Sequence, residues 1–563
     1  MSKPSSIPMS HHSHPTDSSL AEATQRWWQA LAAGDALNPL PAELVRLHQA
    51  NNRITAEPIW ALMDSPHYRA AAMDGYAVRA AATLDAQPNA PLRLALGETA
   101  YRVDTGDLVP DVYDAVIMCE AVHLLTESEP PHIEIVKAAT PGQHIRPIGE
   151  DMQIGQLILP ANHRLRPVDI GAAAGAGHTG LWVRRQPRIA ILPTGSELVA
   201  PGSAMQPGDI VEYNSLMLAA AAQEWGAVVT RLPPIADDLD AIRTAVAAAL
   251  PLHDLVVVNA GSSAGREDYT AAVFGQLGQI VVQGIAMRPG HPTILAFADL
   301  TLETAGARST VRKALAGIPG YPVSAVITFE QLIQPLIRLW QGQSAAEPLR
   351  LAATLAQSIH SQPGQDEFLR VSLAQVGTRL WAIPLPRHAG AVMSLVRADG
   401  MLHLPPDNGG YAAGETVLVD LRADTQQFYN TIVVAGEPSP VLTVLSDQLR
   451  QQQPTLRLIM LPTDESGAWL ALQQAKAHLA VCYLRDTGEG EYNLPSIRLV
   501  WPEFTGEVVR LAQQGSGWLD WVVPATQAGD AKIQTLLAVA RSREFKRQLG
   551  AKDTYTVDQI GVI

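Results

Sequence analysis

The segment from Arg188 to Leu198, RIAILPTGSEL, decides the fold. Its apolar run from Ile189 to Leu192 predicts a buried strand, and the Pro-Thr-Gly that follows predicts a turn where the strand ends. Helical and strand-like segments then alternate: NSLMLAAAAQEWGA (214–227), VVTRLPPIADD (228–238), DAIRTAVAAAL (240–250) and DLVVVNAGSSAG (254–265). This alternation predicts a doubly wound α/β domain over residues 186–340, with ligands beyond the carboxyl ends of its parallel strands.

A chain of 563 residues is too long to fold around one hydrophobic core, so further domains are expected on both sides of this one. Apolar spacing predicts helix within residues 20–50, from Leu20 to Leu31 and again at Leu44 and Leu47. Short runs separated by turns predict β-rich units elsewhere. The expected units are a disordered tail (1–19), a helical or linker domain in two segments (20–55 and 147–185), a β-rich domain (56–146), the α/β domain (186–340), a small β-barrel (345–425) and a second α/β unit (430–563).

Composition and charge narrow the classes of function. The chain is 47% hydrophobic and 17% charged, which is typical of a globular protein, and its formal net charge of -14 argues against a nucleic-acid partner. The two cysteines, Cys119 and Cys482, lie far apart without metal-ligand spacing and indicate a reducing compartment. Without a signal peptide or an apolar run long enough to span a bilayer, the sequence predicts a soluble cytoplasmic protein.

Two loops at predicted strand ends carry groups suited to phosphate and metal. In PTGSEL, the residues Thr194, Gly195 and Ser196 offer amides and hydroxyls to an oxyanion, and Glu197 offers a carboxylate to a cation. In NAGSSAGREDY, glycines flank two serines in a form that suits a phosphate, and Asp268 follows where it could hold Mg²⁺. The glycines and serines concerned are Gly261, Ser262, Ser263 and Gly265. Ordinary polar turns remain the alternative for both loops.

Two later segments extend the candidate site. MRPGHP contributes Arg288 and His291 as possible anion contacts. GIPGYPVSA places a rigid turn directly before an apolar helix, whose start presents a positive dipole end to an anion. The residues of that turn are Pro319, Gly320, Pro322 and Ser324. A purely structural turn explains the prolines equally well.

These segments resemble, in order, those of the molybdopterin molybdenumtransferases, the MoeA/gephyrin family. The matching strings, spread over roughly residues 20–425, are AAMDGYAV, VDTGDLVP, GEDMQIG, PTGSEL, NSLML, AGSSAGREDY, RPGHP and GIPGYPVSA. The resemblance implies a MoeA-like arrangement in which residues 186–340 form a MogA-like molybdopterin-binding domain. It also implies a homodimer, in which the AAMDGYAV loop faces the α/β sheet across the subunit interface.

The implied activity is insertion of molybdate into adenylylated molybdopterin, with Mg²⁺-dependent release of AMP. By resemblance, Asp74 lies near the reacting centre, Thr105 hydrogen-bonds the pterin phosphate or molybdate, and Ser394 lines the cleft. Because substrate and oxyanion are both anionic, carboxylates would hold a bridging Mg²⁺. The candidate ligands are Glu197, Asp268 and one of Asp237 or Asp238. A MogA-like adenylyltransferase is the implied partner.

The sequence departs from the family pattern at several points, among them AGSSAG where a GGVSVG-like string is common and VYD at 112–114 in place of a glycine-containing turn. Arg288 and His291 stand where the family has the lysines of a Lys-Pro-Gly-Lys-Pro string, and Tyr321 stands where asparagine is usual. Arginine keeps the charge but not the compact geometry of lysine. Two alternatives therefore stay open beside the enzyme: a non-catalytic molybdate or pterin sensor or carrier, and a scaffold of the same fold. The choice between molybdate and tungstate is also open.

Residues 430–563 resemble a periplasmic-binding-protein-like, LysR-effector-like domain with a shortened second lobe. The matching strings are VVAGEPSPVL, AHLAVCYLRDTGEGEYNLP and REFKRQLG. Ser439 lies at one predicted helix start, and Ser466 with Gly467 at another, so an accessory oxyanion site is expected there. Serines that only cap their helices are the alternative.

Overall fold

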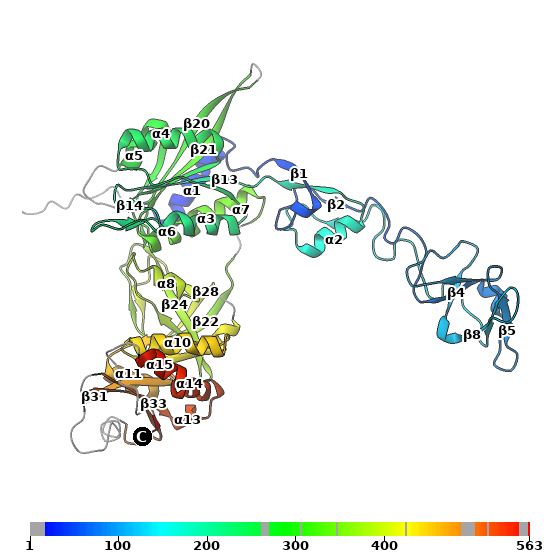
Figure 1. The fold of residues 1–563 in the computed structure, drawn as a ribbon. Helices are drawn as coiled ribbons and strands as arrows, with labels where there is room; N and C mark the ends of the chain where they lie inside the picture. The colour runs from blue at the N-terminus through cyan, green and yellow to red at the C-terminus, as the bar shows by residue number, and fades with distance from the viewer. Residues whose placement is uncertain are drawn as a thin grey trace, which may run out of the picture.

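The computed structural model describes residues 17–260, 269–304, 307–344, 347–422, 425–485, 501–514, 517–550 and 561–562. Figure 1 shows an α/β domain from which a long arm extends to the right, while a β-barrel and then a C-terminal α/β unit lie below it. No helix among these residues has the length and apolar character to cross a bilayer.

The α/β domain is built on a six-stranded sheet of order β16-β13-β17-β21-β20-β18. Its strands are β16 (Val228–Arg231), β13 (Arg188–Thr194), β17 (Leu255–Ala260), β21 (Ala307–Pro319), β20 (Ile294–Thr304) and β18 (Gln279–Gln283). The first four are parallel, as predicted, whereas β20 and β18 join in antiparallel pairings that the β–α–β reading did not include.

Helices cover both faces of this sheet. One face packs against helices α1 (Leu20–Ala32), α3 (Asn214–Glu224), α6 (Pro322–Thr328) and α7 (Gln334–Trp340), and the other against α4 (Leu239–Ala249) and α5 (Tyr269–Leu277). In β13, Ile189 and Ile191 belong to the first core and Ala190 and Leu192 to the second. This double burial explains why the strand reads as a continuous apolar run.

The near part of the arm consists of two-stranded pairs and one helix. Strand β1 (Ala42–Arg46) pairs with β12 (Gly180–Arg184), β2 (Ile59–Trp60) pairs with β11 (Leu157–Leu159), and α2 (Pro167–Gly175) packs beside them. The helix predicted over Leu44 and Leu47 is wrong: Leu44 lies in β1 opposite Trp182, and Leu47 begins the short 3₁₀ helix η1 (Leu47–Gln49). The β pairing gives hydrogen-bond partners to backbone N–H and C=O groups that would have none in an isolated helical turn.

The outer part of the arm holds two three-stranded sheets. They have the orders β6-β4-β7 and β5-β9-β8. Their strands are β4 (Gly75–Val78), β5 (Leu92–Ala95), β6 (Ala100–Val103), β7 (Ala115–Met118), β8 (Val122–Leu125) and β9 (His132–Ile135). Figure 1 places these strands at the end of the arm farthest from the α/β domain.

The predicted small β-barrel is confirmed, and it closes. Its strands are β22 (Arg350–Leu355), β24 (Asp366–Val376), β25 (Arg379–Pro384), β26 (Gly400–Leu404) and β28 (Thr416–Leu421). The sheet runs β24-β25-β22-β28-β26, and pairing of β26 with β24 closes it. A short strand from the α/β domain, β19 (Met287–Arg288), adds to β24, and helix α8 (Val392–Val396) lies between β25 and β26 in the chain.

The C-terminal unit contains a six-stranded mixed sheet of order β30-β29-β31-β33-β32-β34. Its strands are β29 (Thr431–Gly436), β30 (Arg457–Pro462), β31 (Leu479–Arg485), β32 (Gly506–Gln514), β33 (Gly517–Pro524) and β34 (Gly561–Val562). Helices α10 (Pro440–Gln452), α14 (Ala531–Arg541) and α15 (Arg543–Gly550) share one core with the sheet. The opposite core, which includes α11 (Glu465–Gln473), is shared with the barrel.

Candidate functional site

Asp74 and Thr105 meet at the outer end of the arm. The Asp74 Oδ1 accepts the Thr105 backbone N–H at 2.6 Å and its hydroxyl at 2.7 Å. These two bonds, the backbone one first, lower the pKa of the exposed Asp74 carboxyl. Gly75 is required by close packing, because a Cβ there would lie 2.1 Å from the Ile117 carbonyl oxygen. The loop thus presents an ionised carboxylate on a rigid support.

The PTGSEL loop ends strand β13 in the α/β domain. Thr194 and Gly195 are buried, Ser196 is exposed and Glu197 is half-buried. Gly195 has a φ of +153°, and a Cβ on it would lie 3.0 Å from the Glu197 carboxylate. A glycine at this position therefore leaves room for the Glu197 side chain beside the turn. Ser196 Oγ accepts the Asp237 N–H at 3.1 Å, which brings the Asp237 backbone beside the loop.

The predicted metal ligands are only partly brought together. Asp238 is the N-cap of α4, because its Oδ1 accepts the Ala241 N–H at 2.8 Å. Its carboxylate is therefore used to cap the helix. Among the described residues, no three His, Cys, Asp or Glu side chains gather as a metal site. Asp268 lies outside the described residues, together with Gly261, Ser262, Ser263 and Gly265. Glu197 and Asp237 therefore remain as the described carboxylates beside the Ser196 contact.

The GIPGYP turn is held at the strand ends by two asparagines. The Asn259 side chain donates to the Pro319 carbonyl at 2.7 Å. The Asn214 side chain donates to the Gly320 carbonyl at 2.7 Å and to Asn259 Oδ1 at 3.0 Å. Pro322 then begins helix α6, in which Ser324 is 5% exposed. Neither asparagine was among the predicted site residues, although both lie in the strings NSLML and VVVNAG that marked it.

The RPGHP segment lies between α6 and the N-terminal segment. Gly290 has a φ of +132°, and a Cβ there would lie 2.8 Å from Thr328 Oγ1 of α6. His291 Nε2 lies 2.8 Å from Asp17 Oδ2. Ser18 forms a β-bridge with Ile285. Residues 17–19, which the composition assigned to a disordered tail, instead contact the α/β domain.

Ser394 contacts a buried arginine that sequence reasoning missed. Arg370 is 1% exposed, and its Nε donates to Ser394 Oγ at 3.1 Å. Its other nitrogens donate to the carbonyl oxygens of Phe368 at 3.3 Å and Pro386 at 2.6 Å. No carboxylate in the described part of the chain forms an ion pair with it. Burial, and then the charge of Arg422, lower the pKa of Arg370 to about 10, so it stays charged at neutral pH.

The surroundings of Arg370 join the barrel to the α/β domain. The Val323 N–H, in α6, donates to the Ala389 carbonyl at 2.9 Å. Arg288 lies opposite Glu367 in the pairing of β19 with β24. Arg422 forms an ion pair with Glu330, which follows α6. Arg370, Ser394 and the start of α6 therefore lie at one junction of two domains.

The C-terminal strand ends carry carboxylates beside the predicted anion contacts. Ser439 precedes α10, is 6% exposed, and its Oγ has no hydrogen-bond partner among the residues that the structure describes. Helix α11 begins earlier than predicted: Asp464 is its cap, and it already accepts the Gly467 N–H at 2.7 Å, while Ser466 lies one residue inside the helix. Burial, followed by the neighbouring Glu437, raises the pKa of Glu465.

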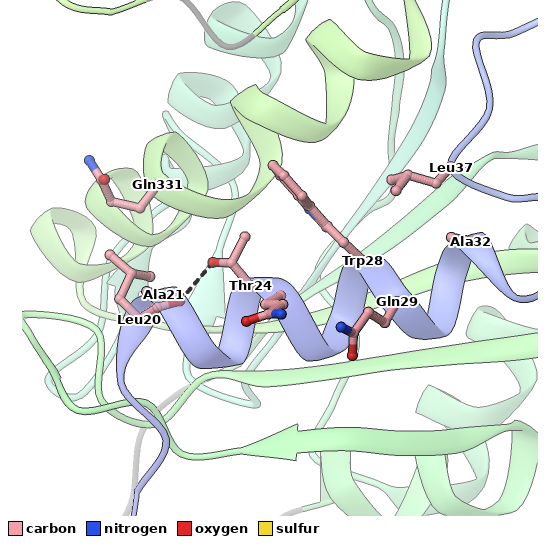
Figure 2. A pocket seen from close by; sticks show the side chains of 9 residues that line it. Leu20, Ala21, Thr24, Trp28, Gln29, Ala32, Leu37 and Gln331 are labelled. Atoms are coloured by element: carbon pink, nitrogen blue, oxygen red, sulfur yellow. Dashed lines mark hydrogen bonds between the residues drawn. The ribbon is translucent and has the colours of Figure 1, made fainter.

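A separate apolar groove runs along the exposed side of α1. Figure 2 shows Leu20, Thr24 and Trp28 in a row on that helix, with Leu37 and Gln331 across from them. Its volume is about 550 Å³. Polar groups are scarce along the groove, so it is an apolar surface.

Comparison with known proteins assigns the domains. Residues 18–177 match the MoeA N-terminal region (domain I and II), residues 190–339 match a probable molybdopterin binding domain, and residues 352–421 match the MoeA C-terminal region (domain IV). The chain belongs to the molybdopterin molybdenumtransferase family. The family matches end before the C-terminal unit begins.

Individual members of the molybdenumtransferase family agree with this assignment. The molybdopterin molybdenumtransferase of Haemophilus influenzae is 31% identical over 406 residues, which are 68% of this chain and 94% of that protein. Molybdopterin molybdenumtransferase 2 of Mycobacterium tuberculosis is 32% identical over 397 residues, 67% of this chain and 94% of that protein. The crystal structure of a MoeA protein from Pyrococcus horikoshii covers 70% of this chain and 98% of its own, with 30% identity and a TM-score of 0.58.

Proposed function

We propose that this protein inserts molybdate into adenylylated molybdopterin and releases AMP. The observation that carries the proposal is the Arg370–Ser394 pair, a buried guanidinium that forms no ion pair with any carboxylate of the described residues and lies next to a hydroxyl; Glu367 acts on it only through its charge. A buried charge is costly unless an opposite charge is supplied. Tetrahedral oxyanions accept hydrogen bonds from arginine and from hydroxyls, so molybdate suits this place once the Ser394 hydroxyl turns from the Ala391 carbonyl, to which it donates at 2.7 Å.

The pterin nucleotide would occupy the neighbouring strand ends. The GIPGYP turn and the start of α6 place a helix dipole close to the barrel, where the Val323 N–H donates to the Ala389 carbonyl. Thr194 and Ser196 lie at the end of β13, which is parallel to β17 and β21. Ligands of such sheets bind beyond the carboxyl ends of adjacent parallel strands. This arrangement supports a phosphate-binding role for these residues and for the predicted Gly261–Gly265 loop.

Mg²⁺ fits the donor set that the α/β domain offers. The Glu197 carboxylate and the exposed Asp237 are oxygen ligands, which Mg²⁺ prefers, and the Ser196 contact keeps their backbones close. With Asp268, which follows the predicted phosphate loop, they would hold the ion. Bound there, Mg²⁺ would neutralise phosphate charge during cleavage of the phosphoanhydride.

A homodimer would complete the site. Asp74 with Thr105 lies at the outer end of the arm, whereas Glu197 lies in the α/β domain, and Figure 1 shows these regions far apart in one chain. The arm also exposes paired apolar residues, namely Leu44 opposite Trp182 and Trp60 opposite Leu157. Such pairs, like the α1 groove, suit burial against a second copy of the chain. In that dimer, Asp74 of one subunit would approach the strand ends of the other.

Three finer assignments also belong to this proposal. The C-terminal unit would be a periplasmic-binding-protein-like domain, which its mixed sheet with helices on both faces supports. Its accessory anion site would use the unpartnered Ser439 hydroxyl at the start of α10, although Glu437 and Glu465 weaken an anion there. The protein would act in the cytoplasm with a MogA-like adenylyltransferase supplying its substrate.

The test is AMP release from adenylylated molybdopterin with Mg²⁺ and molybdate. We expect molybdate-dependent release by the wild-type protein and its loss in Arg370→Gln, with Arg379→Gln, an exposed arginine of the same barrel, as the matched control. Binding without release would instead indicate the sensor or carrier, and neither would indicate the scaffold. The comparisons do not favour these alternatives, because the chain covers 94% of its enzyme relatives.

A further inference from the structure

The C-terminal unit reaches into the barrel through one arginine. Arg457 begins strand β30, and its guanidinium binds both oxygens of Asp399, at 2.6 Å each. It also donates to the Leu373 carbonyl at 3.0 Å and to Thr431 Oγ1 at 2.6 Å. The Asp399 side chain is 2% exposed and that of Arg457 is 16% exposed. This is a buried, two-pronged ion pair between units that are far apart in sequence.

Asp399 belongs to the segment that carries Ser394. Three successive contacts align this segment with strand β24. Arg370 Nε donates to Ser394 Oγ at 3.1 Å, Ser372 Oγ donates to the Arg397 carbonyl at 2.9 Å, and the Leu373 N–H donates to Asp399 Oδ2 at 2.7 Å. The partners advance together along both segments, so they act as rungs that fix helix α8 against the strand.

We propose that Arg457 is a positioning residue for the Arg370–Ser394 pair, the proposed oxyanion site. It holds the last rung from both sides, because its guanidinium binds Asp399 and the carbonyl of Leu373 on β24. The first rung is the Arg370–Ser394 pair itself. The C-terminal unit thereby sets the spacing between the guanidinium and the hydroxyl to which molybdate would bind. This inference rests on the proposed function of that pair.

Loss of Arg457 would leave Asp399 buried and unpaired. A carboxylate in that state takes up a proton or turns toward water, and either change weakens its bond to the Leu373 N–H. The segment after helix α8 would then lose its Asp399 side-chain bond to β24 and keep the Ser372–Arg397 contact and the Asp399 N–H bond to the Val371 carbonyl at 2.9 Å. Ser394 would spread over several positions relative to Arg370, which lowers affinity for a tetrahedral oxyanion while leaving the pterin contacts on the α/β domain unchanged.

The experiment uses the full chain and compares Arg457→Gln, Arg457→Lys and Asp399→Asn with the wild type. We expect Arg457→Gln and Asp399→Asn to raise the KM for molybdate about tenfold, with the KM for adenylylated molybdopterin changed less than about twofold. Arg457→Lys should lie between, because it keeps the charge and loses the two-pronged geometry. Arg350→Gln is the matched control, since Arg350 pairs with Asp420 on the exposed side of the same barrel.

Direct titration with sodium molybdate separates this inference from the proposed function. A wild-type protein that neither binds molybdate nor releases AMP would overturn the proposed function. A wild-type enzyme whose three variants keep the wild-type molybdate affinity would overturn only the role of Arg457. Lower melting temperature with unchanged molybdate KM per folded molecule would likewise reduce Arg457 to a structural contact, and Asp399→Asn decides the case if Arg457→Gln does not fold.

Discussion

Replacing Arg370 by methionine should lower both the stability of the fold and the affinity for molybdate. The folded protein disfavours the charged guanidinium, because burial and then the charge of Arg422 lower its pKa to about 10. That shift corresponds to about 3 kcal/mol of stability that the wild-type chain forgoes at neutral pH. Methionine removes this cost and also the three hydrogen bonds to Phe368, Pro386 and Ser394, each contributing roughly 1.5–3 kcal/mol because the donor is charged. The two effects oppose each other and the hydrogen bonds are the larger, so the free energy of unfolding should fall by about 1.5–6 kcal/mol.

Molybdate binding should weaken as well. A hydrogen bond to a charged group contributes about 1.5–3 kcal/mol, and 1.4 kcal/mol is a factor of ten, so Arg370→Met should weaken molybdate binding roughly 10- to 100-fold. Titration calorimetry with molybdate and urea denaturation measure the two quantities, with Arg379→Met as the exposed control. Unchanged molybdate affinity in Arg370→Met, with only the free energy of unfolding lowered, would refute the reasoning, since that is how a purely structural buried arginine behaves.

Three further predictions test other parts of the molecule. If Asp74 of one subunit completes the site of the other, mixing inactive Asp74→Asn and Arg370→Met proteins should restore roughly a quarter of wild-type AMP release, and no recovery would place both residues in one subunit's site. Burial, followed by the Lys532 charge, lowers the pKa of His478 from 6.5 to about 4. The stability that neutral His478 contributes is therefore fully present above pH 6.5 and is lost as pH falls toward 4. The free energy of unfolding of the wild type should fall by about 3 kcal/mol over that interval, and His478→Gln should abolish this dependence on pH. Trp381→Ala should lower the free energy of unfolding of the barrel and the C-terminal unit together by about 3–5 kcal/mol, because the buried indole belongs to the core that they share. If the two units melt separately and the melting temperature of only one of them changes, they have no common core.

The α/β domain was predictable because its strands can be recognised from their own short stretches of sequence. Ile189–Leu192 is buried on both faces and therefore apolar throughout, and the helices that follow begin and end close to their predicted limits. Leu44 misled the prediction because its spacing from Leu47 is also compatible with a helix. It takes part in a strand only because Trp182, far along the chain, pairs with it. Pairing over such a sequence distance leaves no local signal.

The candidate site was less predictable for the same reason. Along β24, Leu369, Val371 and Leu373 alternate with Arg370 and Ser372, which is the pattern of a strand with one face in water. The structure buries that second face under helix α8, so an arginine that reads as solvated becomes a buried cation. Asp238 shows the reverse case, because a carboxylate that suits a metal is used to cap α4. The position of Asp238 in the sequence is compatible with a metal ligand and with a helix cap alike.

Strand β24 also decides how freely the C-terminal unit can move. For that unit to swing as a tethered module, the Arg457–Asp399 pair would have to break, and exposing a large buried apolar side chain of the shared core would cost about 1.5–3 kcal/mol. Trp381 would become exposed at the same time, because its indole belongs to the core that both units share. A free energy of that size keeps the separated state rare. A change in the C-terminal sheet is therefore transmitted to the barrel through Arg457, and the segment it reaches first is the one that carries Ser394.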